Sequence, residues 1–500
     1  MSNTIRVRFL IDREQRRVVF AEAGSDFVDV LFSFLTLPLG RIVRLLKKQS
    51  CLGSLDSLYD SVEKFYGEHL QTEACREMLL NPRSAAAIQC EFLKIKGLHE
   101  PKPRSFYTCS REGCLVQSTC YYTYSLKCLC HLCNKLMVEA SEWSAKTSEE
   151  GGTFVDDKGN FMITDDLRVI PTSLMNGLSH FKEMQIKEGS MLEERVIDFG
   201  TQEVLNLLGR SIVSKNALTS VCFPDALVEE NVGFSLPIKE EVIVKEGEDE
   251  IKLKLVLNKE NNNILYAEVG EDFINVLFSF LTFPLGSVFR LFSDSISLGG
   301  CIKNLYSSAE NIGLECFKSE NCRNMLLNPM LPTFYGCNKN QIPQLEEITS
   351  KKLIVSQGCV KCYFDNEHRT CGSVPCQHGI EQAEIIEWNP KSPKIIMSKK
   401  GCPSQHLMER GEVIEWNPKS AKIMADAGEA FVVCSRKYMI SDNLHISPLS
   451  IISAVGGGMN SSISNMIYKE VYIDSVKARS LLGAMLLSKT VLTDVFSPKP

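Results

Sequence analysis

Two stretches of the chain share one pattern of hydrophobic and polar positions. Residues 21–40 read AEAGSDFVDVLFSFLTLPLG, and residues 267–286 read AEVGEDFINVLFSFLTFPLG. Aligned without gaps, segments 5–46 and 251–292 are identical at 19 of 42 positions, and most of the other pairs are conservative. The chain therefore contains two copies of one folding unit.

Each copy of the shared stretch predicts a helix that is buried on more than one side. We assign its turn and N-cap to Gly24 with Ser25 or Asp26, because short polar side chains accept hydrogen bonds from the first amides of a helix. A membrane span is excluded, since the apolar run carries Asp29 and stops at Pro38, too short to cross a bilayer. The helix face repeats apolar residues at positions i, i+3, i+4, i+7 and i+8, namely Phe27, Val30, Leu31, Phe34 and Leu35.

The segments around this helix have equally regular patterns. Alternation of apolar and polar residues over 5–11 predicts a strand, and 17–22 is the returning strand of a hairpin. Helical patterns follow at 41–48, 54–65 and 72–80, and the last ends before a proline, which disfavours helical geometry in the preceding residue.

The remainder of the repeat contains a cysteine-rich segment at 106–137 and expected strands at 153–156 and 161–164. A closing helix is expected to be capped by Thr201, and its counterpart by Ser475. The predicted fold class is α+β, with two tandem homologous repeats. Each is a β-hairpin followed by helices, a Cys-rich knuckle segment, further strands and a C-terminal helix.

The domain boundaries follow from the duplication. The first repeat covers 1–223 and the second covers 251–500, joined by an acidic linker at 224–250. Because this linker is acidic and has few apolar residues to bury, we expect few contacts across it, and we expect the repeats to be separable.

The second repeat contains a smaller duplication of its own. EIIEWNPKSPK at 384–394 and EVIEWNPKSAK at 412–422 lie 28 residues apart. Two copies indicate a local duplication rather than a solenoid, which needs three or more. We interpret Trp388 and Trp416 as residues packed beside turns, with a binding role as the alternative.

Composition is that of an ordinary globular protein, since 44% of the 500 residues are hydrophobic and 23% are charged. The net charge of −6 gives no chain-wide attraction for nucleic acid or an anionic membrane. The first residues show no apolar run behind a basic start, so no secretory signal is expected. We expect an intracellular protein, cytoplasmic or nuclear, without a transmembrane segment.

The cysteines carry the only candidate chemistry. Twenty cysteines in a long chain of this kind are expected to be reduced thiols, some of them metal ligands. Two close pairs in the first repeat approximate a two-knuckle zinc site, in which four protein ligands leave no open position and the ion is structural. The candidates are Cys109, Cys114, Cys130 and Cys133, with Cys128 as the alternative to Cys130. In the second repeat they are Cys359, Cys362, Cys371 and Cys376, with His368 and His378 as alternates.

Catalytic motifs are absent from the sequence. It has no phosphate-binding loop, dinucleotide-binding glycine motif, His-Glu-x-x-His or Gly-x-Ser-x-Gly. We interpret Asp165 and Asp166 as solvated turn residues. The arginines of the first hairpin, including Arg6 and Arg8, are interpreted as a solvated strand face. A low-pKa cysteine nucleophile with a distant histidine stays open.

Several motifs recur in the order typical of one family. MLLNP at 78–82, CLCHLCNKLM at 128–137, FMITDDLRVIPTS at 161–173 and LLGRSIVSKNALT at 207–219 accompany the shared helix. The chain resembles the plant family called domain of unknown function 674. The resemblance implies a family without an assigned activity, commonly present as tandem copies. It also implies two cysteine pairs, which Cys109, Cys114 and Cys133 match, with Cys128 or Cys130 as the fourth residue.

The leading hypothesis is a non-enzymatic binding or scaffold protein with structural zinc and an unknown protein partner. The alternative is a thiol- or metal-dependent enzyme. RNA binding through the first repeat is a weaker alternative, and the oligomeric state stays open.

Overall fold

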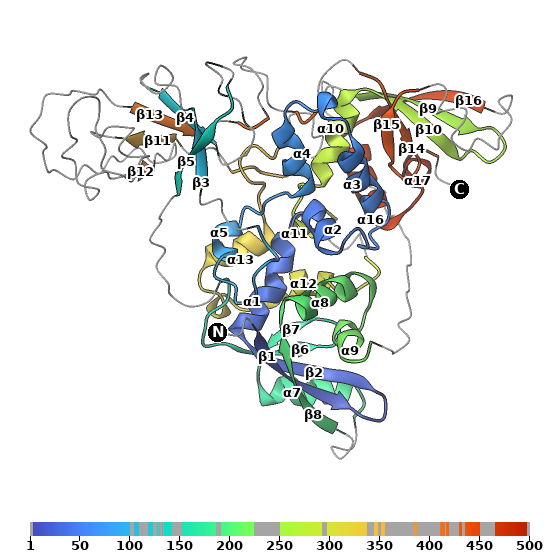
Figure 1. Ribbon diagram of the computed structural model, residues 1–500. Coiled ribbons are helices and arrows are strands. Elements are labelled where there is room, and N and C mark those ends of the chain that lie inside the picture. The colour runs from blue at the N-terminus through green and yellow to red at the C-terminus, as the bar shows by residue number, and fades with distance from the viewer. Residues whose placement is uncertain are drawn as a thin grey trace, which may run out of the picture.

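The structure is a computed structural model in which two sheets lie at opposite ends with helices between them (Figure 1). Only the described residues are considered below. They are 4–100, 105–109, 119–123, 128, 130, 133, 135–142, 153–186, 192–224, 251–292, 298–337, 345–348, 352–355, 385–387, 411–415, 417–419, 430–432, 436–450 and 466–497.

The first repeat forms an antiparallel sheet with the strand order β7-β6-β2-β1-β8. The predicted hairpin is confirmed, since Ile5, Val7 and Phe9 are buried while Arg6 and Arg8 are exposed. This alternation gives the sheet one face in the core and one in water. Its strands are β1 (Ile5–Asp12), β2 (Arg17–Gly24), β6 (Asn160–Thr164), β7 (Val169–Pro171) and β8 (Leu192–Phe199).

The second repeat builds the same sheet with the order β15-β14-β10-β9-β16. The registers correspond as well. Phe161 of β6 pairs with Ala23, and Tyr438 of β14 pairs with Val269, the counterpart of Ala23. The α+β class and the two repeats are therefore confirmed. The strands are β9 (Ile251–Asn258), β10 (Ile264–Val269), β14 (Tyr438–Ser441), β15 (Ile446–Pro448) and β16 (Met466–Ile473).

The helices also occur in corresponding sets. The first repeat contributes α1 (Ser25–Ser33), η1 (Phe34–Thr36), α2 (Leu39–Leu45), α3 (Leu55–Lys64), η2 (Gly67–His69), α4 (Glu73–Leu80), α5 (Ala87–Cys90), α7 (Leu174–Glu183), α8 (Thr201–Val213) and α9 (Ala217–Cys222). The second contributes α10 (Glu271–Phe280), α11 (Leu285–Phe292), α12 (Lys303–Asn311), η4 (Leu314–Cys316), α13 (Glu320–Leu327), α16 (Ser475–Leu487) and α17 (Val491–Phe496).

Three local predictions are corrected by this assignment. The N-cap of α1 is Gly24, without a side-chain hydrogen bond, so neither Ser25 nor Asp26 caps the helix. The closing helices begin at Thr201 and Ser475, but their N-caps are the preceding Gly200 and Asp474. The Asp474 carboxylate accepts a 2.7 Å hydrogen bond from the amide of Lys477.

The expected strand at 153–156 is also wrong. There, Val155 makes only an isolated bridge to Phe317 of the second repeat. The amides of Thr153, Phe154 and Val155 instead donate to the Asp29 carboxylate, at 2.6, 2.7 and 2.9 Å. These bonds hold the segment on α1, while backbone bonds of Phe154 and Asp156 join it to residues 316–318 of the second repeat.

The two repeats exchange helices. Helix α3 of the first repeat contacts β15 of the second, and Ser61 Oγ accepts a 2.9 Å hydrogen bond from the amide of Ile446. Helix α12 of the second repeat contacts β7 of the first, where Ser308 Oγ accepts a 2.9 Å bond from the amide of Val169. Each sheet is therefore covered in part by a helix of the other repeat.

The exchange has its centre at the Pro-Leu-Gly sequence that both repeats share. Pro38 and Pro284 form an antiparallel bridge. On either side of it the amide of Leu39 donates to the carbonyl of Phe283, and that of Leu285 to the carbonyl of Leu37, each at 2.9 Å. One hydrophobic cluster contains buried residues of both repeats. The expectation of few contacts between the repeats is therefore wrong, while the linker at 225–250 lies outside the described residues.

A third sheet joins the cysteine-rich parts of both repeats, in the order β12-β11-β13-β4-β3-β5. The contact between repeats is the parallel pairing of β13 with β4. The two copies of the internal duplication lie on either side of β11, because Ile354 pairs with Ile386 and with Glu412. The strands are β3 (Ser105–Thr108), β4 (Thr119–Thr123), β5 (Val138–Glu142), β11 (Lys352–Val355), β12 (Ile385–Glu387) and β13 (Gly411–Glu415).

Candidate metal centre

The third sheet positions the cysteines of the first repeat. Cys109 follows directly after β3, and β5 begins directly after Met137. Backbone bonds from the Cys130 amide to the Lys135 carbonyl (2.8 Å) and from the Met137 amide to the Cys128 carbonyl (2.9 Å) close a turn. This turn carries Cys130 and Cys133 back to the end of β3.

Three thiols meet at this point. The sulfur atoms of Cys109, Cys130 and Cys133 all lie within 4.8 Å of one another, and those of Cys109 and Cys133 are 3.5 Å apart. Sulfur ligands about 2.3 Å from a tetrahedral zinc ion are separated by about 3.8 Å. The three thiols are therefore close enough together to be three ligands of such a site.

The centre is enclosed by the protein. Cys109 and Cys130 are buried, with Cys133 partly exposed, and the cluster packs against Met137 and against Ala74 of α4. The arrangement can therefore hold a metal whose ligands are protein atoms.

The structure also separates the two alternatives for the second pair. Cys130 belongs to the group of three sulfurs, whereas the Cys128 sulfur lies 3.8 Å from the Thr123 hydroxyl. Cys128 is buried in the same small cluster without joining the three sulfurs.

The other predicted ligands lie outside the described residues. Cys114 falls in the segment 110–118. Trp416, which was predicted to pack beside a turn, also lies outside the described residues. The second-repeat candidates Cys359, Cys362, Cys371 and Cys376, their alternates His368 and His378, and Trp388 are outside as well.

Four other cysteines of the described residues are poorly suited to act as nucleophiles. Burial raises the pKa of the Cys75 and Cys90 thiols. It also raises the pKa of Cys222 and of Cys301 to about 12 each. Because the thiolate is the reactive form, the raised pKa disfavours these four side chains as nucleophiles at neutral pH.

The acidic residues near the turn after β6 have a structural role. Asp165 accepts hydrogen bonds from the amide and the hydroxyl of Thr219 at 2.7 and 2.6 Å, and so caps α9. Asp442 makes the same pair of bonds to Thr493, at 2.8 and 2.7 Å. Burial raises the pKa of Asp165 to about 6. The interpretation of Asp165 as a solvated turn residue is therefore wrong, because its carboxyl is half-buried and bonds to α9.

The arginines of the first hairpin face carboxylates. Arg6 is paired with Asp198 at 3.4 Å, and Arg8 with Glu22 at 2.5 Å. These ion pairs are exposed, and they neutralise the charge of the arginines on a strand face that stays in contact with water.

Sequence reasoning missed the burial of Lys419. Lys419, in the second copy of the internal duplication, is 1% exposed, donates to the Gly336 carbonyl and lies 4.7 Å from the centre of the Phe431 ring. The neighbouring Pro418 carbonyl accepts a 2.7 Å bond from the Thr72 hydroxyl of the first repeat. The Asn-Pro-Lys sequence, which both copies of the duplication contain, was the available signal.

One of three comparisons with known proteins found a match. A family model described as a protein of unknown function (DUF674) matches residues 1–456 and residues 300–499. The comparisons with curated proteins and with solved structures found no match. Within the described residues, no helix is both long and apolar enough to span a bilayer.

Proposed function

The chain belongs to the DUF674 family, and from this premise we propose that it is a non-enzymatic binding or scaffold protein with a structural zinc ion. The observation that carries the proposal is the group of three thiol sulfurs at Cys109, Cys130 and Cys133. Thiolates in this number and at this separation are typical of closed, tetrahedral zinc sites. Cys114 is the proposed fourth ligand.

The ion would stabilise the sheet to which both repeats contribute. The cysteine turn packs on Ala74 of α4. The segment before α4 bonds to the second repeat, since the Gln71 amide donates to the Phe431 carbonyl at 2.9 Å. Because metal binding is coupled to the folding of its ligands, zinc would order the cysteine turn against this junction. The proposed role of the sheet is to present a surface to a protein partner.

The environment of the other thiols supports a binding role over the alternative of a thiol-dependent enzyme. The pKa of the Cys75, Cys90, Cys222 and Cys301 thiols is raised by burial, which opposes a thiolate nucleophile. A metal-dependent enzyme would need an open coordination position, and a fourth cysteine would close it.

X-ray absorption at the zinc edge of the full-length protein tests this proposal. We expect about one zinc per chain at the first-repeat site, with four sulfur ligands near 2.3 Å. Three sulfurs and one oxygen at the metal would leave a water position and favour the enzyme. Protein purified without chelator that contains no metal would contradict the structural zinc site.

A further inference from the structure

Strand β16 is the outer strand of the second-repeat sheet, at the upper right of Figure 1. It pairs with β9 along its whole length. Alternate residues of a strand direct their amides and carbonyls to opposite sides, so an outer strand has a row of backbone groups beyond its sheet. Among the described residues no strand pairs with that row, although Lys477 Nζ binds one carbonyl of β16, that of Tyr472, at 2.8 Å.

The side chains of this outer strand include three large apolar residues in contact with water. Ile467 is 40% exposed, Tyr468 is 75% exposed and Tyr472 is 44% exposed. A long outer strand with exposed apolar side chains is a template for pairing with another strand.

The corresponding strand of the first repeat, β8, is protected by charge. The registers align the two strands residue by residue, because Phe199 pairs with Ile5 and Ile473 pairs with Ile251, the counterpart of Ile5. Charged side chains on an outer strand oppose pairing with another chain. The sheet does not require apolar residues here, since β8 has acids at the same positions. In place of Ile467, Tyr468 and Tyr472, β8 contains Glu193, Glu194 and Asp198.

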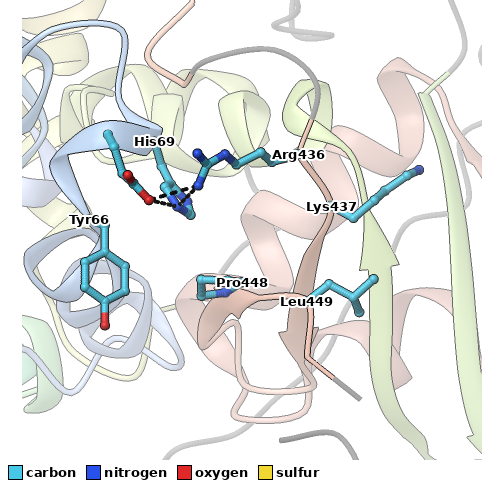
Figure 2. Close-up of a pocket in the computed structure, with 7 residues that line it drawn as sticks. Tyr66, His69, Arg436, Lys437, Pro448 and Leu449 are labelled. Carbon is cyan, nitrogen blue, oxygen red and sulfur yellow. Dashed lines mark hydrogen bonds and ion pairs between the residues drawn. The ribbon is translucent and has the colours of Figure 1, made fainter. Parts of the chain in front are cut away.

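Two cations of the second repeat already have carboxylate partners. Arg436 lines a pocket of about 480 Å³ between η2 and β14, and its Nη1 lies 3.0 Å from Glu68 Oε1 (Figure 2). Lys252 of β9 pairs with Glu470 of β16 at 2.8 Å. Because the chain supplies a carboxylate to each of these two cations, neither indicates a ligand.

Lys469 of β16 differs from these two cations. Its side chain is exposed and follows Ile467 and Tyr468 along the strand. It faces the apolar Leu255 of β9, and it has no ion-pair partner within the described part of the chain. A strand added on the outer side would place one residue directly opposite Lys469, where an acidic side chain is favoured.

We propose that the outer edge of β16 binds an extended segment of a partner protein, which adds to the sheet as a further strand. The segment has an acidic residue opposite Lys469 and apolar residues opposite Ile467 and Tyr468. Backbone hydrogen bonds supply affinity, and these side chains supply specificity. The inference rests on the proposed function only in that the ligand is a protein, and it uses neither the zinc ion nor the third sheet.

A second copy of this chain fits the edge less well. In a two-fold antiparallel pairing that continues the sheet, one residue must lie opposite its own copy, because both strands keep the same face outward. The two registers with the greatest overlap place Lys469 opposite Lys469 or Glu470 opposite Glu470. Like charges directly opposite are destabilising, so the charge pattern favours a different chain.

Titration of the full-length protein with a labelled peptide, followed by fluorescence anisotropy, tests the edge. Strand β9 shows which side chains match β16, so the probe is the peptide of residues 251–258 with Leu255→Glu, which places a carboxylate opposite Lys469. We expect this peptide to bind more tightly than the same peptide with Leu255→Lys. The protein variant Lys469→Glu should reverse that order. Hydrogen exchange should show that the amides of β16 become protected.

The variants separate strand addition from general attraction. Ile467→Glu combined with Tyr468→Glu carries the acids of β8, so this double variant should fold and should weaken binding by about tenfold or more. Leu174→Glu is the control, because it adds a carboxylate at a side chain of α7 that is 80% exposed, and it should bind unchanged. A peptide that is N-methylated on the edge facing β16 keeps its side chains and should not bind.

The proposal is overturned if the wild-type protein does not bind the Leu255→Glu peptide, or if the double variant or the N-methylated peptide binds equally well. Protection of the β8 amides in place of those of β16 would also overturn it. A dimer of the protein alone in sedimentation, lost in the double variant, would show that a second copy occupies the edge. None of these variants touches a cysteine, so a protein without zinc would reject the proposed function and leave this inference standing.

Discussion

The amide of Gly40 donates a 2.7 Å hydrogen bond to the carbonyl of Leu281, and this bond joins the two repeats in the middle of the core. A Cβ added at Gly40 would lie 2.9 Å from the carbonyl oxygen of Leu79 and 3.1 Å from that of Leu281. Because both neighbours are backbone atoms, they can give way only if helices move. We expect Gly40→Ala to lower the free energy of unfolding by about 1–3 kcal/mol, measured by chemical denaturation.

Gly177→Ala is the matched control for this change. Gly177 lies within α7, and nothing stands within 4 Å of an added Cβ. Alanine has the higher helix propensity, so this variant should be as stable as the wild type or more stable by about 0.5–1 kcal/mol. If Gly40→Ala also leaves the free energy of unfolding unchanged, the close approach of the repeats is not the reason for glycine at position 40.

The helix exchange predicts that the two halves stay together after the chain is cut. Ser61 on α3 and Ser308 on α12 each bond to the sheet of the other repeat, and the apolar faces of these helices are buried there. A protease site inserted in 224–250 should yield two fragments that co-elute in size-exclusion chromatography. Fragments that separate without denaturant, each still folded, would contradict the exchange.

Much of the architecture could be read from the sequence because its elements follow local rules. The alternation in β1 and the apolar helix at 25–36 predicted the hairpin and the central helix, and the duplication predicted both sheets. Periodicity identifies a buried face without identifying what covers it. Helix α3 has the same apolar stripe whether it covers its own sheet or the other one, so the exchange could not be predicted.

The same limit applies to side chains that lie far apart in the chain. Cysteine spacing assigned Cys109, Cys130 and Cys133 to one candidate site, and their sulfur atoms lie within 4.8 Å of one another. Spacing could not decide whether Cys128 or Cys130 joins the cluster, because that depends on the side of the turn that each side chain faces. His69 and Arg436 are 367 residues apart in the chain and meet only through the exchange, so no motif could indicate them.

Phe34 lies in the middle of the shared core, fully buried in η1, which contacts α11 and α13 of the second repeat. Removing the ring leaves a cavity lined by both repeats. Phe34→Ala should therefore lower the free energy of unfolding by about 3–5 kcal/mol in chemical denaturation. Phe92→Ala, at a side chain that is 43% exposed, should cost far less. Equal losses at the two positions would show that burial in the core does not set the cost.

Asp29 predicts a pH dependence of stability. Burial raises its pKa to about 6 from 3.8, although three backbone amides favour the charged form. The folded state therefore binds the Asp29 proton more tightly than the unfolded state does. The stabilisation that this proton gives the folded state is complete below pH 3.8 and is lost as pH rises through 6. Asn275 occupies the equivalent position and accepts from the amides of Phe431 and Val432.

Asp29→Asn should therefore gain stability relative to the wild type as pH rises from about 4 to 7. The gain is on the order of 3 kcal/mol, since about two pKa units correspond to that energy. Denaturant unfolding of both proteins at the two pH values measures the difference, and any fixed cost at the Thr153 amide cancels between them. A difference that does not vary with pH would mean that the Asp29 pKa is not raised.

The turn between β4 and β5 offers the most direct test of the zinc site, because it contains two neighbouring buried cysteines with different surroundings. The Cys130 sulfur lies with those of Cys109 and Cys133, while that of Cys128 lies beside the Thr123 hydroxyl. Cys130→Ser should remove the metal, since a hydroxyl is a poor zinc ligand at neutral pH, whereas Cys128→Ser should retain it. Metal analysis of the two purified full-length variants gives the result. Both changes replace a buried sulfur with oxygen, so a general loss of packing would affect them alike. Retention of zinc by both variants, or its loss from Cys128→Ser alone, would show that the ion is not held by the three clustered thiols.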